Sequence, residues 1–159
     1  MRTLALIFAV LLGALSFGST VHAASTVPFQ ATIDTAPAPV GFCGPTCLEL
    51  TIPGTGTASH MGRAGMVGLT QIDVATLGQT GTATLTAADG SSLDMSFTGT
   101  FAPGPAGPSD STFGGTWTAT GGTGRFDGVS GGGTYNGSAS GPVGILFLNG
   151  SLSNPGKKR

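Results

Sequence analysis

Apolar and polar residues alternate along most of the chain after its first 25 residues, and this is the side-chain period of a β-strand with one buried face. The clearest example is residues 93–101, where Leu, Met, Phe and Gly alternate with Asp, Ser and Thr. The same period predicts about eight strands. They lie at residues 27–33, 48–52, 66–73, 82–87, 93–101, 112–120, 131–139 and 143–152. No segment after the first 25 residues has the 3.6-residue period of a helix, so we predict an all-β fold.

Short connections join the predicted strands, and the pair Asp89 and Gly90 between two alternating runs is a strong signal for a β-hairpin. Sequential antiparallel strands with one apolar face each either stack as a sandwich or close into a barrel. Closure removes the exposed edges, and the interleaved glycines relieve crowding where strands bend. We therefore predict a single closed antiparallel barrel, with a β-sandwich as the alternative. An outer-membrane barrel is disfavoured because the outward positions are largely threonine.

The first 23 residues have the three parts of a secretory signal peptide. Arg2 supplies a positive charge, residues 4–15 are almost wholly apolar, and Val21, His22 and Ala23 form a cleavage site. The apolar run is shorter than the roughly 20 residues of a membrane-spanning helix. We expect a signal peptide at 1–23, a β-barrel domain at 24–154 and a basic flexible tail at 155–159. The protein would then be secreted or periplasmic, with no transmembrane anchor after cleavage.

Charged residues make up only 8% of the chain, and after removal of the leader five basic and seven acidic side chains give a formal charge of −2. A nucleic-acid partner would need clustered Lys and Arg, so we predict none. Glu49 is the only glutamate, and general acid–base catalysis needs positioned titratable groups. We therefore assign no catalytic residue and no cofactor, and we favour a protein that is not an enzyme. The sequence carries no signal for an oligomeric state.

Cys43 and Cys47 are separated by three residues and precede a predicted strand, whereas a thioredoxin-like site has two intervening residues at the start of a helix. Export to an oxidising compartment favours a structural disulfide. A metal site formed by these cysteines and His60 would lack a fourth ligand, so we predict no metal.

Three further charged or titratable side chains could act at a site. His60 is the one histidine after the leader, and no serine in a nucleophile pattern accompanies it, so we interpret it as a turn residue. Arg63 and Arg125 either orient an anionic ligand or tie loops together at one end of the barrel. In the second case, their expected partners are Asp73, Asp94 or Asp127.

Residues 121–128 form a turn with four glycines, which we interpret as architectural. Phe126 is its only bulky apolar residue and is predicted to plug one end of the barrel, with Arg125 and Asp127 pointing away from it. A second packing prediction follows from strand parity: four aromatic side chains should share one core. They are Phe97, Phe101, Phe113 and Trp117.

The turn at residues 121–128 resembles one in the allene oxide cyclase and dirigent barrel superfamily. Residues 59–63 resemble a second stretch in bacterial exported members, although Ala64 stands where an aromatic residue often follows. The likeness covers most of residues 28–153. It implies an eight-stranded antiparallel barrel with an apolar cavity, in which plant members guide cyclisation or radical coupling. No catalytic residue of the family is assigned to a position in this chain.

Three functions are compatible with these observations. The barrel could bind an apolar small molecule or a partner without catalysis, act as a cyclase-like or dirigent-like enzyme in its cavity, or serve as a structural surface protein with a filled barrel. The interior discriminates between them. A dry apolar void favours binding, a void of several hundred Å³ with one or two converging polar groups favours the enzyme, and a filled core favours the structural protein.

Overall fold

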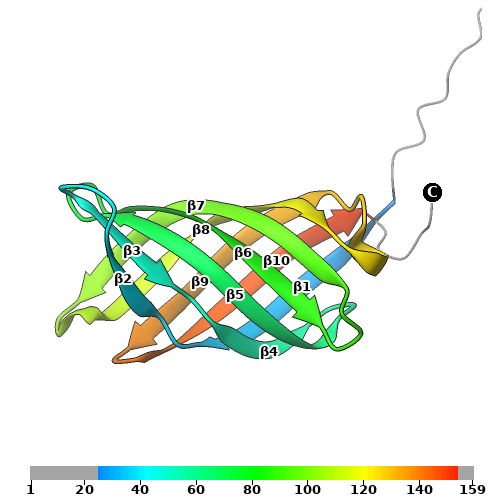
Figure 1. The fold of residues 1–159 in the computed structure, drawn as a ribbon, viewed down its shortest axis with the longest axis horizontal. Helices are drawn as coiled ribbons and strands as arrows, with labels where there is room; N and C mark the ends of the chain where they lie inside the picture. The colour runs from blue at the N-terminus through cyan, green and yellow to red at the C-terminus, as the bar shows by residue number, and fades with distance from the viewer. Residues whose placement is uncertain (1–24, 154–159) are drawn as a thin grey trace, which may run out of the picture.

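The computed structural model of the chain describes residues 25–153, which form ten β-strands and one short 3₁₀-helix (Figure 1). The expected signal peptide and basic tail lie outside the described residues. In chain order the elements are β1 (Thr26–Thr35), β2 (Ala38–Phe42), β3 (Cys47–Thr51), β4 (Gly54–Ala58), β5 (Gly62–Asp73), β6 (Gly78–Ala87), β7 (Ser92–Gly104), β8 (Gly107–Gly122), η1 (Gly124–Phe126), β9 (Gly131–Ser140) and β10 (Val143–Ser153).

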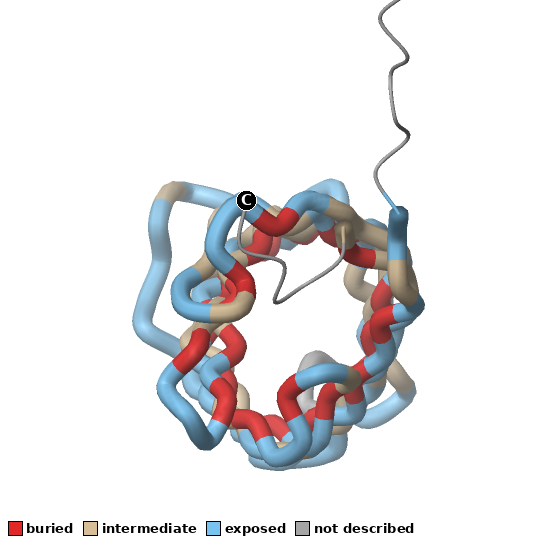
Figure 2. The backbone as a smooth tube through the Cα atoms, turned by 90° about the vertical axis from the view of Figure 1, so that its right-hand side faces the viewer, coloured by how far each residue is buried: buried red, intermediate tan, exposed pale blue. Residues whose placement is uncertain are grey.

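Eight of these strands, β1 and β4 to β10, form a closed antiparallel barrel. From β4 to β10 each strand pairs with the next along the chain, and β1 closes the ring by pairing with both β10 and β4. Figure 2 looks along the barrel and shows buried positions alternating with exposed ones around the ring. The predicted closed barrel is therefore confirmed, and the alternative β-sandwich is wrong. Within the described residues no helix is long or apolar enough to cross a membrane.

The two additional strands, β2 and β3, form a hairpin at one end of the barrel (Figure 1). β3 continues the line of β4 along β5, and Ile52 bridges them because its amide donates to Gly68 O at 2.8 Å. Pro53 follows and cannot donate a backbone hydrogen bond, which interrupts this line. β2 pairs with β3 alone among the described strands, and all five of its residues are exposed.

Strand β4 was not predicted because its sequence, Gly-Thr-Gly-Thr-Ala, has no large apolar residue. Its small side chains have a steric reason. A Cβ atom at Gly56 would overlap the carbonyl oxygen of Thr32, and one at Gly54 would meet Ile33 at 2.7 Å. β4 therefore needs glycine where it lies close to β1, and for this reason its sequence lacks the apolar alternation that marks other strands.

The half of the barrel that carries η1 is densely packed. Phe126 is fully buried and lies in one cluster with Phe29, Leu85, Leu93 and Leu152, which are also fully buried. This confirms that Phe126 plugs an end of the barrel. The turn that inserts it depends on glycine: Gly124 has φ 62°, and a Cβ atom there would overlap the hydroxyl of Ser91.

Candidate functional site

The opposite half of the barrel holds a cavity of about 530 Å³. It extends from Trp117 and Met95 near the middle of the barrel to Val74, Leu77 and Gly141 at the turns beside the β2–β3 hairpin. Small-molecule sites typically have volumes of roughly 300–1,000 Å³, so this space is large enough for a ligand of several rings. It is the candidate site.

The wall of the cavity is mostly apolar because the strands turn their apolar faces inward, as the alternation predicted. Its largest contributors are aliphatic, thioether and aromatic side chains. They include Leu48, Leu50, Ile52, Met66, Ile72, Met95, Phe97, Phe101, Phe113, Leu146 and Leu148.

Two phenylalanine rings lie against the wall over glycines of neighbouring strands. Phe97 is paired with Gly81, and Phe113 is paired with Gly137; a Cβ atom at either glycine would overlap the facing ring. Aromatic rings commonly cover strand glycines in this way. Because these rings cover glycines of the wall, they line the interior without filling it.

The four aromatic residues expected to share a core all face the interior, but they are not equally buried. Trp117 is 2% exposed and packs edge-to-face on Phe29, with ring centroids 5.5 Å apart. Phe97 and Phe113 are only partly buried, and Phe101 lies farther out on the cavity wall. Trp117 therefore forms the floor that separates the packed half from the cavity. It is also the only tryptophan of the sequence.

Three polar side chains of the wall form a chain of hydrogen bonds. The Tyr135 hydroxyl donates to Gln79 Oε1 at 3.2 Å, and Gln79 Nε2 donates to Thr70 Oγ1 at 3.1 Å. The Thr70 hydroxyl then donates to the carbonyl oxygen of Thr80 at 3.2 Å. All three side chains are at most 5% exposed. These hydrogen bonds are not predicted from the sequence, because the alternation places the strand at residues 82–87. The strand begins at Gly78, and this puts Gln79 on the inward face.

No described residue that lines the cavity is an Asp, Glu, His, Lys or Arg, and Tyr135 is the one lining group that titrates. Burial raises the pKa of Tyr135 to about 12, so its phenol stays neutral at physiological pH. A charged ligand would find no counter-ion on this wall, and burial of an unpaired charge is costly. The cavity therefore suits a neutral guest.

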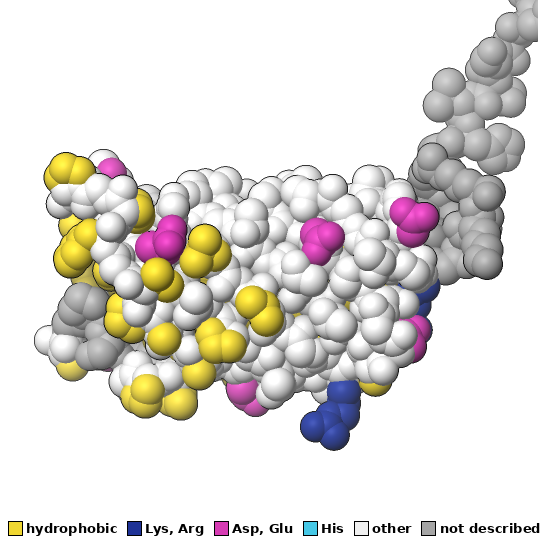
Figure 3. Space-filling model, viewed as in Figure 1, with side chains coloured by type: hydrophobic (Ala, Val, Ile, Leu, Met, Phe, Trp, Pro, Cys, Tyr) yellow, Lys and Arg dark blue, Asp and Glu magenta, His cyan; other side chains and the backbone are white. Residues whose placement is uncertain are grey.

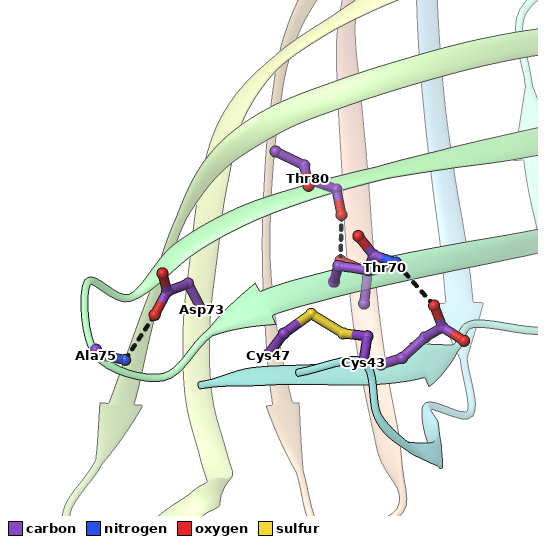
Figure 4. The surroundings of a disulfide bond; sticks show 8 residues. Cys43, Cys47, Thr70, Asp73, Ala75 and Thr80 are labelled. Carbon is purple, nitrogen blue, oxygen red and sulfur yellow. Dashed lines mark hydrogen bonds between the residues drawn. A yellow bond between two sulfur atoms is a disulfide. The ribbon is translucent and has the colours of Figure 1, made fainter. Parts of the chain in front are cut away.

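The predicted disulfide between Cys43 and Cys47 is present, with Cα atoms 5.0 Å apart (Figure 4). It closes the tip of the β2–β3 hairpin, where the Cys43 amide also donates to Cys47 O at 2.9 Å. The metal site considered with His60 is not formed, because both sulfur atoms are bonded to each other. A disulfide is compatible with an oxidising extracellular or periplasmic location.

His60 and Arg63 lie on the outside of the barrel. His60 occupies a turn with φ 63°, is exposed, and its Nε2 lies 3.1 Å from Pro28 O. Arg63 is exposed on β5 and has no ion pair within the described part of the chain. Neither side chain lines the cavity.

Arg125 ties two loops at the packed end. Its Nη2 lies 3.2 Å from Asp89 Oδ1, which joins η1 to the turn between β6 and β7, and its guanidinium lies over the Phe126 ring at 5.7 Å. The partner thus differs from the three aspartates that we expected. Asp73 instead accepts the Ala75 amide within its own turn, and Asp94 accepts the Thr84 hydroxyl at 2.7 Å. The prediction that Arg125 points away from Phe126 is also wrong, because the guanidinium packs over that ring.

The end with the cavity also carries exposed apolar side chains. Phe42 of β2 is 77% exposed, and Val40, Val74 and Leu77 are exposed in the same hairpin and in the β5–β6 turn. Figure 3 shows apolar side chains gathered at this end and continuing over the outer face of the barrel. The cavity reaches exposed residues at this end, among them Val74, Leu77 and Gly141, and we call this end its mouth. The surroundings of the mouth are therefore apolar, like the cavity wall.

Comparisons of the chain with known protein families, curated proteins and solved structures find no match.

Proposed function

We propose that this protein is exported and binds a neutral, apolar small molecule in the barrel cavity without catalysing a reaction. One observation carries the proposal: the barrel encloses a mostly apolar cavity of about 530 Å³, and no described lining residue changes its charge near neutral pH. Removal of apolar ligand surface from water would supply the binding energy, at about 25 cal/mol per Å².

A cyclase-like or dirigent-like enzyme is the second candidate. A cavity of this size with two converging polar groups, Tyr135 and Gln79, is the interior that we expected for such an enzyme, and a shape-guided reaction needs few ionisable groups. General acid–base catalysis works best when the pKa of the group is near the working pH, whereas the pKa of Tyr135 is about 12. We therefore rank binding first. A structural protein with a filled barrel is the least favoured, since a cavity of about 530 Å³ lies inside the barrel.

The proposal is tested by titrating the purified protein with neutral apolar probes and following the emission of Trp117, which lies at the cavity floor. We expect saturable changes in emission and a raised Tm. Ala139→Phe places a ring in the cavity and should weaken binding by more than about tenfold. Ser138→Phe, on the exposed face of the same strand, is the matched control and should leave affinity unchanged.

Equal affinities in the two variants would contradict a site inside the barrel, and no saturable binding by any probe would contradict the proposal. Chromatography and NMR of the probes recovered after incubation separate the two candidate functions, because a cyclisation changes the structure of a molecule without changing its mass. Recovery of the unchanged probe agrees with binding alone, whereas a new isomer or a coupled product would favour the enzyme.

A further inference from the structure

Tyr135 reaches across the barrel wall because of two glycines that lie in register with it. Gly115 pairs with Tyr135, Gly99 pairs with Gly115, and Gln79 pairs with Gly99, so the four residues form one row across β9, β8, β7 and β6. A Cβ atom at Gly99 would come within 2.6 Å of the Tyr135 hydroxyl oxygen. The glycines therefore leave room for the phenol to lie over the wall and meet Gln79.

The direction of the hydrogen bonds follows from counting protons. The Thr70 hydroxyl has one proton and donates it to Thr80 O, so the group that faces Thr70 must be a donor. That group is Gln79 Nε2, which leaves Gln79 Oε1 facing Tyr135. The Tyr135 proton is then used by Oε1, and its oxygen keeps lone pairs that accept. Hydrogen bonds aligned in this way polarise one another. The Tyr135 oxygen, which begins the chain as a donor, therefore becomes a stronger acceptor.

The cavity wall also carries the hydroxyls of Thr35 and Ser111 and the indole N–H of Trp117, and the Thr35 hydroxyl and the Trp117 N–H are buried without a hydrogen-bond partner among the described residues. At Tyr135 and Gln79, by contrast, an acceptor and a donor lie side by side. Tyr135 offers an acceptor, and Gln79 Nε2 has a second N–H that can donate. The two residues are joined by a 3.2 Å hydrogen bond, so both functions are presented at one place. A hydroxyl group meets both at once, because it donates and accepts. A carbonyl or an ether oxygen only accepts, and it would leave Tyr135 facing an apolar group or another acceptor.

We propose that the cavity selects a neutral apolar molecule with one hydroxyl group, an alcohol or a phenol, whose hydroxyl is held by Tyr135 and Gln79. This inference rests on the proposed function and names its ligand class. Phe97 packs edge-to-face on Tyr135, with centroids 5.5 Å apart, and holds the phenol at the wall. The apolar surfaces of the cavity then enclose the rest of the molecule.

The test compares three probes that share one carbon skeleton: menthol, menthone and menthyl methyl ether. Their dissociation constants are measured from the emission of Trp117 in the full-length folded protein. We expect menthol to bind at least about tenfold more tightly than either of the others, because only menthol can donate to Tyr135. This comparison uses the unaltered protein and does not depend on the folding of a variant.

Two variants locate the preference. Tyr135→Phe should reduce the advantage of menthol over menthone to less than about threefold while leaving the affinity for menthone nearly unchanged. Ser111→Ala removes another hydroxyl from the same wall, outside the hydrogen-bonded chain, and should leave the advantage of menthol intact. Thermal unfolding of each variant establishes that it is folded.

The outcomes are distinguishable. Equal binding of all three probes, or tighter binding of menthone, would overturn the hydroxyl preference and leave the apolar site in place. Binding of none of the probes would contradict the proposed function together with this inference. A preference for menthol that Tyr135→Phe does not change would overturn the role given to Tyr135.

Discussion

The two halves of this barrel are built from the same strands, yet one is packed solid and the other encloses a cavity. In the packed half, the turn with η1 inserts Phe126 between the strands, where it is fully buried beside Phe29 and Leu93. In the other half, rings such as Phe97 and Phe113 lie over wall glycines, and the turns stay at the rim. The interior of an eight-stranded barrel can therefore be filled by side chains or can leave room for a ligand. Which of the two occurs depends on whether a loop inserts into the barrel and on where its aromatic rings lie.

The largest effect should come from removing the plug of the packed half. Phe126→Ala should lower the free energy of unfolding by about 3–5 kcal/mol, because it opens a cavity in a fully packed region. Phe101→Ala, on the wall of the existing cavity, should cost no more than about 1–2 kcal/mol, since few contacts are lost there. Urea unfolding of both variants measures the difference. Equal losses would show that the two halves are packed alike.

The disulfide should matter less than the plug, because it closes only a short ring in the hairpin beside the mouth. Replacing Cys43 and Cys47 together by serine should cost about 2 kcal/mol, from the loop-closure entropy of the unfolded chain. Urea unfolding of the double variant checks this value. A thiol assay on the native protein should find no reactive thiol, and two reactive thiols would contradict the bond.

Alkaline pH should weaken the fold through Tyr135. Its pKa in the folded chain is about 12, whereas an exposed phenol has a pKa near 10. Between these values the unfolded chain releases the proton and the folded chain keeps it, so the free energy of unfolding falls as pH rises. The loss should reach about 2 kcal/mol near pH 11.5 and be absent in Tyr135→Phe. Absorbance of this single tyrosine reports its pKa directly, and a value near 10 would place the phenol in water.

The smallest effect should come from the ion pair at the packed end. Arg125→Ala should change stability by no more than about 1 kcal/mol, because both partners of the Asp89 pair are more than one third exposed. Arg63→Ala is a matched control on the barrel exterior. If Arg125→Ala abolished binding of a probe without changing Tm, η1 would be a recognition site and the cavity would not act alone.

The sequence predicts the strands and their inward faces well, since alternation directly encodes which side chains face the interior. It does not reveal β4, whose glycines and threonines give no apolar signal, or β2, where a proline and a glycine interrupt the pattern. Both strands depend on pairing with neighbours, which is a tertiary effect.

The candidate site was harder to predict from sequence than the fold. Prediction of its hydrogen-bonded side chains requires the registers of several strand pairs at once. Tyr135 meets Gln79 only because Gly115 and Gly99 lie between them in one row. The partner of Arg125 likewise comes from a turn more than thirty residues earlier. Alternation identified which aromatic residues face inward, but the presence of a cavity depends on where their rings lie, and that is set by glycines on neighbouring strands.

The central claim is that one half of the barrel is packed and the other receives an apolar guest. A crystal of the protein under xenon pressure tests it most directly, because xenon occupies apolar cavities without needing a specific hydrogen bond. We predict xenon density between Trp117 and the mouth, lined by Leu50 and Phe113, and none around Phe126. Absence of xenon from the half beside the β2–β3 hairpin, or its presence around Phe126, would contradict the account.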